Sequence, residues 1–120
     1  MKRRIVPFLV KAGIALLVLL AACSDDKPEC KPLPSECQEP GPSYANDVAP
    51  IIAARCAMCH NGEPGMEWSL AEYDDVYDWR GTITIQLRNC SMPPADSGYT
   101  LPENERETIN AWLICDAKNN

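Results

Sequence analysis

Seven cysteines and a single histidine in 120 residues constrain this chain more than any other feature of its sequence. An odd number of cysteines cannot all pair with one another, so at least one of them has a different role. The chain length suits one domain with tails. A lone histidine excludes any site that requires two imidazole ligands, including two-histidine zinc centres.

The N-terminal segment has the order of residues expected of an export signal. Basic residues come first, and an apolar run over residues 12–22 follows, which is too short to span a bilayer and ends in small residues. Leu20-Ala21-Ala22-Cys23 resembles a bacterial lipobox, which implies cleavage before Cys23 and lipidation of that cysteine. We therefore expect residues 1–22 to be a lipoprotein signal peptide, although an ordinary signal peptide followed by a chance cysteine is the alternative. The serine at position 24 favours sorting to the outer membrane.

Removal of this segment would change the charge of the protein. The whole chain carries 11 basic and 17 acidic residues, a net charge of -6, and four of the basic residues lie in the segment. Residues 23–120 would keep seven basic and 17 acidic residues, a net charge of -10. Such a surface repels nucleic acid and attracts basic partners. Export would place the cysteines in an oxidising compartment, where disulfides persist.

Residues 23–42 are rich in proline and in acidic residues and carry almost no apolar side chains. Because proline fixes φ, we expect a semi-rigid linker between the lipidated Cys23 and a domain at 43–120. Cys30 and Cys37 lie seven residues apart within it, and we expect them to close a small disulfide loop.

The domain at 43–120 shows helical periodicity in three places. We predict helices over 46–58, 69–78 and 102–115, the second of them opened by a capping box at Ser69-Leu70-Ala71-Glu72. Residues 82–87 fit both a strand and a helical turn, and the local pattern leaves the two open. A domain this small usually needs a metal, a disulfide or a cofactor in addition to its apolar core.

Cys56-Ala57-Met58-Cys59-His60 follows the first predicted helix. C-x-x-C-H is the attachment signature of c-type haem. Each thiol can form a thioether bond with one vinyl group, and His60 then falls beneath the iron as the proximal ligand. The alternatives are a thioredoxin-like redox dithiol, a plain disulfide within the motif, and a zinc site that adds Cys90 and Cys115, although those spacings match no common zinc module.

An iron atom with one histidine ligand either takes a sixth ligand or keeps an open position, and methionine is the usual sixth ligand in electron-transfer cytochromes. Met58 lies inside the attachment loop, and Met66 lies only six residues past His60. Met92 is followed by two prolines, which stiffen the loop that would carry its sulfur to the iron. We predict Met92 as the sixth ligand, although methionine more commonly fills a core.

From Tyr44 to Cys115 the sequence resembles a small class I cytochrome c domain. The matching pieces are Asp47-Val48-Ala49-Pro50-Ile51-Ile52 leading into the haem motif, then Ser91-Met92-Pro93-Pro94, and a closing helix that contains Trp112-Leu113. The resemblance implies an all-α fold, with three to four helices around one covalently bound haem c. It favours a helix over residues 82–87 and implies that the first and last helices cross.

The chain departs from this family in two places. Pro64-Gly65 stands where many members have Gly-Pro, so Pro64 is the candidate acceptor for the ring N–H of the proximal histidine. Cys90 and Cys115 are additional, and a disulfide between them would tie the methionine loop to the last helix. The three tryptophans, at positions 68, 79 and 112, are expected to fill the core or to pack against the haem.

These observations predict a lipid-anchored monohaem c-type cytochrome that carries single electrons between periplasmic or membrane redox partners. We expect these redox proteins to have basic docking surfaces. The sequence shows no nucleophile, general base or substrate pocket, so we do not expect an enzyme. The alternatives are a haem-based sensor or gas-binding domain with a displaceable sixth ligand, and an electron-entry subunit of a larger oxidoreductase.

Overall fold

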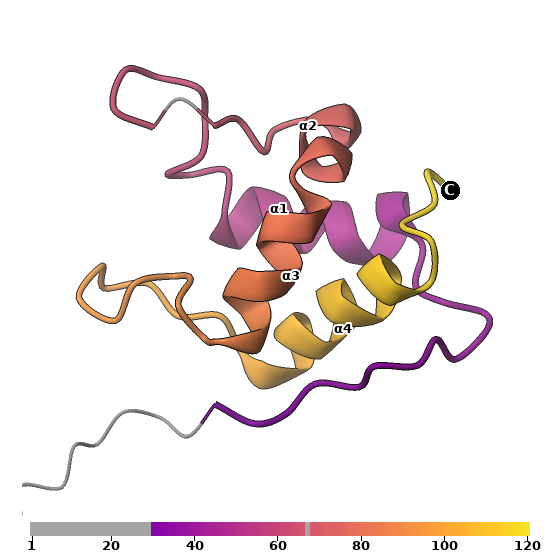
Figure 1. Cartoon of the computed structure of the whole chain (residues 1–120). Helices are drawn as coiled ribbons and strands as arrows, with labels where there is room; N and C mark the ends of the chain where they lie inside the picture. Colours follow the sequence, from indigo (N-terminus) through magenta and orange to yellow (C-terminus); the bar gives the residue numbers. More distant parts are fainter. Residues whose placement is uncertain (1–29, 67) are drawn as a thin grey trace, which may run out of the picture.

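A computed structural model describes residues 30–66 and 68–120 of the chain. This part is all-α and contains no strand (Figure 1). Its elements are a π-helical turn and four α-helices, namely η1 (Tyr44–Val48), α1 (Ala49–Arg55), α2 (Tyr73–Asp78), α3 (Arg80–Arg88) and α4 (Glu103–Ile114). Within the described ranges, no helix has the length and apolarity needed to cross a membrane. The predicted signal peptide at 1–22, the lipidated Cys23 and linker residues 24–29 lie outside the described residues.

The predicted first helix over 46–58 corresponds to η1 followed directly by α1, so it begins two residues earlier and ends at Arg55. Ser43 explains the start, because its side chain accepts from the Asn46 amide at 3.3 Å while its own amide donates to the Asp47 carboxylate at 2.8 Å. Pro50 fits into the first turn of α1, where its missing amide proton leaves no hydrogen bond unmade.

The predicted capping box at Ser69 is wrong. The Ser69 hydroxyl accepts from the amide of Ala71, only two residues away, and α2 begins later, at Tyr73. Serine often closes such a local turn in place of a helix cap. Residues 82–87 lie in α3, so the helical alternative is confirmed. The predicted last helix is α4, within one residue at each end.

The core lies where η1 and α3 pack against α4. Its fully buried side chains include Val48, Val76, Ile109 and Trp112, so the core position expected for Trp112 is confirmed. The Trp112 indole also donates to the Lys118 carbonyl at 2.9 Å, which folds the C-terminal residues back onto α4. A buried indole N–H normally finds such a partner.

Residues 30–42, the N-terminal strap, run along α4 in an extended conformation (Figure 1). Two disulfides fasten this strap to the domain, Cys30–Cys90 and Cys37–Cys115. The predicted pairs 30–37 and 90–115 are therefore wrong, although the same four cysteines pair. The reason is the position of the strap, which brings Cys30 to the end of α3 and Cys37 to the end of α4.

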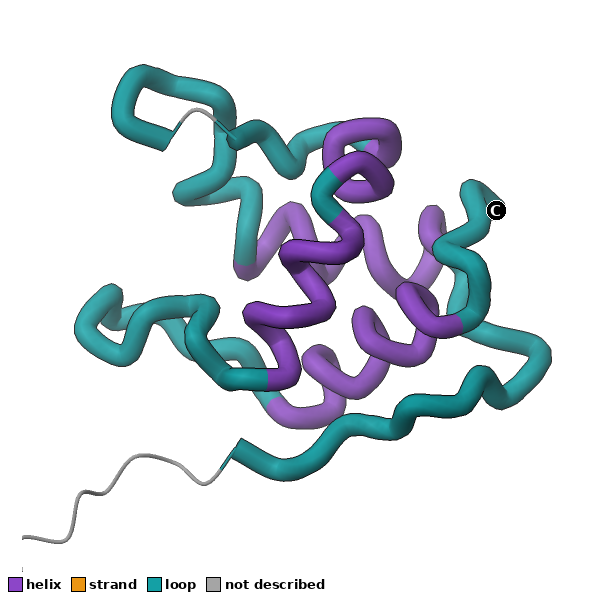
Figure 2. Tube along the Cα trace, in the orientation of Figure 1, coloured by secondary structure: helices purple, strands orange, loops and turns teal. Residues whose placement is uncertain are grey.

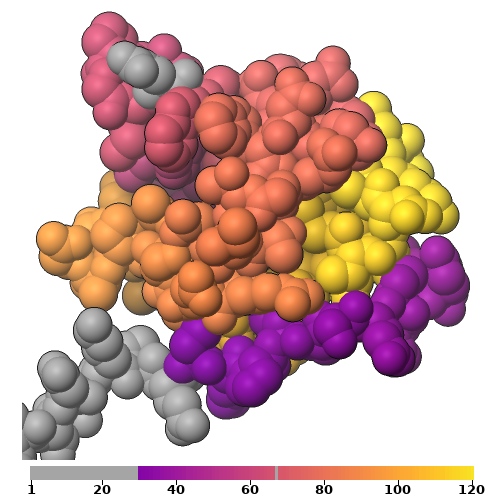
Figure 3. Space-filling model, viewed as in Figure 1, coloured from indigo at the N-terminus to yellow at the C-terminus, as the bar shows by residue number. Residues whose placement is uncertain are grey.

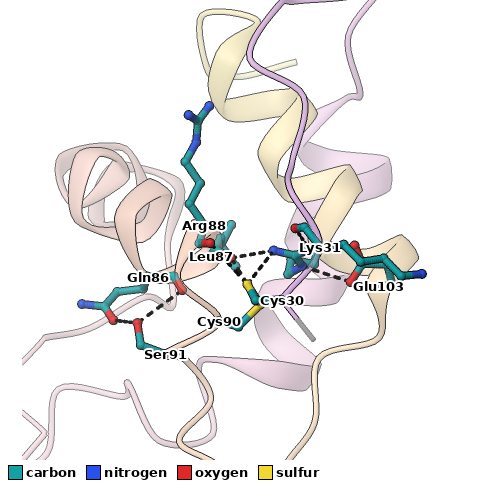
Figure 4. The surroundings of a disulfide bond; sticks show 9 residues. Cys30, Lys31, Gln86, Leu87, Arg88, Cys90, Ser91 and Glu103 are labelled. Carbon is teal, nitrogen blue, oxygen red and sulfur yellow. Dashed lines mark hydrogen bonds and ion pairs between the residues drawn. A yellow bond between two sulfur atoms is a disulfide. The ribbon is translucent and has the colours of Figure 1, made fainter. Parts of the chain in front are cut away.

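Two polar side chains of α4 bind the carbonyl groups of the strap. Arg106, only 3% exposed, donates to the carbonyl of Lys31 at 2.6 Å and to that of Leu87 at 2.8 Å. Its guanidinium also lies 3.6 Å from the sulfur of Cys30, and Figure 4 shows the Cys30–Cys90 disulfide between Lys31 and Leu87. Asn110 donates to the carbonyl of Pro34 at 2.9 Å. An extended strap has no internal partners for its carbonyls, and these donors supply them. The prediction of a separate linker is therefore wrong for residues 30–42.

Candidate functional site

A cavity opens between α1, α3 and two segments outside the helices, namely residues 56–66 with 68–72, and residues 89–102. Figure 2 draws these segments as loops. Its empty space is about 910 Å³, a figure that includes the open solvent at its mouth. Figure 3 shows the two loops as separate lobes with a notch between them. The apolar wall is made by Ile52, Leu70, Ile83, Leu87, Pro93, Leu101 and Ile109.

This cavity collects the side chains that the sequence predicted for the site. Cys56, Cys59 and His60 line it from the end of α1, and Met92 lines it from the loop after α3. Met58 and Met66 are exposed and do not line it. Of the methionines in the described ranges, Met92 alone lies where a sulfur atom can face the same space as the imidazole.

The backbone of the C-x-x-C-H motif forms a tight turn that continues α1. The amides of Cys59 and His60 both donate to the carbonyl of Cys56, at 3.1 and 2.9 Å. The carbonyl of His60 accepts from the amide of Leu70 at 2.8 Å, which fixes the residue from the other side. Two cysteines and the following histidine are thus held at the rim of one cavity.

The imidazole of His60 is incompletely satisfied. Its Nδ1 is fully buried and has no hydrogen-bond partner among the described residues. The predicted bond from this ring to the carbonyl of Pro64 is therefore wrong, and Pro64 lies in an exposed turn. A buried polar atom without a partner is costly and calls for an explanation, such as a role in binding.

The thiols of Cys56 and Cys59 are free, whereas the other cysteines in the described ranges are paired. Burial raises the pKa of the Cys56 thiol to about 11, with smaller contributions from Cys59 and Glu105. A raised pKa does not favour Cys56 as the attacking thiol of a redox pair. The proposed zinc alternative is wrong, because both of its additional cysteines, at 90 and 115, are in disulfides.

Two tryptophans extend the site from His60 toward the surface. The ring of Trp68 is nearly parallel to that of His60, with centroids 6.4 Å apart, and Trp79 stacks on Trp68 at 5.1 Å. Both indoles line the cavity and are partly exposed. Their predicted role against a bound group remains a prediction, but their position beside the cavity agrees with it.

Sequence reasoning missed Arg55, which precedes the motif and also lines the cavity. Its guanidinium makes two hydrogen bonds to the Glu105 carboxylate, at 2.7 and 3.0 Å, and so joins the end of α1 to α4. These bonds hold the pKa of Glu105 below its usual range. The available sequence signals were a basic residue before the motif and an acidic residue in the first turn of the last helix, but neither predicts the partner.

Comparison of the chain with known protein families, with curated proteins and with solved structures finds no match. The functional interpretation therefore depends on the residues of the site.

Proposed function

We propose that this protein is a monohaem c-type cytochrome that carries single electrons. One observation carries the proposal, namely that a single apolar cavity holds two free thiols, one imidazole and one thioether at its walls. Cys56 and Cys59 would bind the haem covalently, and His60 and Met92 would be its axial ligands. The fold would accordingly be a small cytochrome c fold.

The residues present fit a haem c group. Because Nδ1 of His60 is buried, Nε2 is the ring nitrogen that can bind iron. The thiols of Cys56 and Cys59, which attachment of the haem requires, are not paired in a disulfide. When bound, haem c supplies an iron that gains and loses one electron. The apolar wall would give the iron a surrounding of low polarity, and a thioether ligand would favour the reduced state. If His60 and Met92 both hold the iron, the protein would leave it no open position for a substrate.

We further propose export and attachment to the outer membrane through lipid on Cys23. The two disulfides support export, because disulfides persist in oxidising compartments. The excess of acidic residues supports redox partners with basic docking surfaces.

The decisive experiment is an optical spectrum of the membrane-extracted protein, followed by two methionine variants. We expect a low-spin ferric haem with the weak near-red band of a thioether ligand. Met92→Ala should abolish that band and allow the ferrous form to bind carbon monoxide. Met66→Ala is the matched control, because its side chain lies outside the cavity, and it should leave the spectrum unchanged.

Three outcomes would contradict parts of this proposal. A protein purified without covalent haem would overturn the cytochrome assignment. An unchanged spectrum of Met92→Ala would overturn the ligand assignment. Ready binding of carbon monoxide by the unmodified ferrous protein would favour the gas-binding alternative, and stable co-purification with an oxidoreductase would favour the electron-entry subunit.

A further inference from the structure

The Cys30–Cys90 disulfide determines where the chain N-terminal to residue 30 joins the domain. Cys90 follows α3, two residues before Met92, at the start of the loop that forms one side of the cavity. This loop and the C-terminus lie at opposite ends of the domain (Figure 1). A lipid on Cys23 would therefore be attached to the domain on the side where the cavity opens.

The length of chain left between the lipid and the domain is short. Six residues lie between Cys23 and Cys30, and the seven steps from one to the other can span at most about 25 Å when fully extended. A free linker up to residue 43 would span almost three times as far. A compact domain of this size is roughly 30 Å across, so reaching its opposite face along the surface would take about 45 Å. The segment from Cys23 to Cys30 is too short to reach the opposite face, whereas a free linker from Cys23 to residue 43 could reach it.

The loop at 91–101, which we name the methionine loop, has the composition of a surface that can rest on lipid headgroups. Asp96 is its only charged residue, in a chain that is strongly acidic elsewhere. Tyr99, which borders the cavity, is 45% exposed in it. Tyrosine is enriched at membrane interfaces because its ring is apolar and its hydroxyl is polar.

We propose that the methionine loop is the membrane-contacting surface of the anchored protein, held there by the Cys30–Cys90 disulfide. This inference depends on the proposed lipidation of Cys23. It places the Met92 side of the cavity toward the bilayer and the C-terminus away from it. A redox partner embedded in the membrane would then approach the cavity more easily than a soluble one.

The test uses the lipidated, reduced full-length protein in phosphatidylcholine nanodiscs that contain a lipid with a gadolinium chelate on its headgroup. We expect the amide NMR signals of Ser97 and Tyr99 to be lost, while those of Asp116 and Asn119 persist. The matched control carries a Gly/Ser spacer of about twelve residues between Pro28 and Glu29. This spacer lengthens the segment between the lipid and Cys30. The loss of NMR signal at Ser97 and Tyr99 should then no longer exceed the loss at Asp116 and Asn119.

The failures of the two proposals can be told apart. The mass and haem spectrum of the same sample report lipid and haem independently. A chain without lipid would overturn both the anchor and this inference. A lipidated chain with normal haem, but with equal signal loss at both ends or greater loss near Asp116, would overturn the inference alone. If the spacer variant still loses the amide signals of Ser97 and Tyr99 selectively, the short segment between Cys23 and Cys30 does not determine the orientation.

Discussion

Replacement of both Cys30 and Cys90 by serine should lower the free energy of unfolding substantially. The two cysteines lie 60 residues apart, and closing a loop of that length in the unfolded chain is worth about 4 kcal/mol in the chain-entropy relation. The Cys37–Cys115 disulfide stays intact in this variant and already shortens the path between the two positions. That path is about 33 residues long, so the expected loss is about 3.7 kcal/mol.

Urea unfolding of the protein in its proposed haem-bound form, followed by far-ultraviolet circular dichroism, measures this loss. The same titration followed through the near-red band should show a second effect. Without the disulfide, the methionine loop loses its attachment at residue 90, so the Met92 band should disappear before the helices unfold. The matched control replaces Cys37 and Cys115, which are 78 residues apart and distant from Met92 in sequence. It should be destabilised by a similar amount, with the band and the helical signal lost together.

The number of thiols provides a sharper refutation. With the observed connectivity, replacing Cys30 and Cys90 frees no other cysteine. With pairs 30–37 and 90–115, the same replacement would leave Cys37 and Cys115 as two free thiols. Finding those two thiols in the denatured variant, or a stability loss below about 1 kcal/mol, would show that the reasoning is wrong.

Two further predictions concern residues away from the ligands. A methyl group on Gly41 would lie 2.7 Å from the Cβ atom of Cys115, so Gly41→Ala should cost about 1–3 kcal/mol in urea unfolding. Gly81→Ala is the control, because its site in α3 is open, and it should stabilise slightly; equal effects at both sites would contradict the packing. The lowered pKa of Glu105 stabilises the fold above its ordinary value of 4.5, and this contribution is lost as the pH falls through the lowered pKa. As the pH is lowered, the melting temperature of Glu105→Gln should therefore fall less steeply than that of the unmodified protein. Equal slopes would show that the bond to Arg55 contributes nothing to stability.

The sequence predicted those parts of the site that depend on local spacing. C-x-x-C-H fixes three side chains on one turn, and the structure keeps Cys56, Cys59 and His60 together at one cavity. Met92 was singled out by its prolines, and it lies at the same cavity although it is distant in sequence. The helix over residues 82–87 followed from the family resemblance, since its alternating pattern alone left a strand equally open.

The disulfide connectivity could not be predicted, because four cysteines allow three pairings and local spacing selects none of them. The docking of the strap depends on Arg106 and Asn110, which look like ordinary polar positions of an amphipathic helix in the sequence. Their burial becomes evident only when the carbonyls of Lys31 and Pro34 are placed against them. The cap of α2 failed for a related reason, because a serine can close a local turn as readily as it can cap a helix.

The proline content of the strap acquires a different meaning once the strap is docked. In a free linker, prolines would serve only to keep the chain extended. In a docked strap, they also restrict the unfolded chain, so less conformational entropy is lost when the strap binds to α4. The carbonyl of Pro34 remains available as an acceptor although proline donates no hydrogen bond, and Asn110 uses it. The segment is stiff, and its carbonyls have no partners within the segment itself. Both properties suit it to lie along a helix, with Cys30 next to the start of the methionine loop.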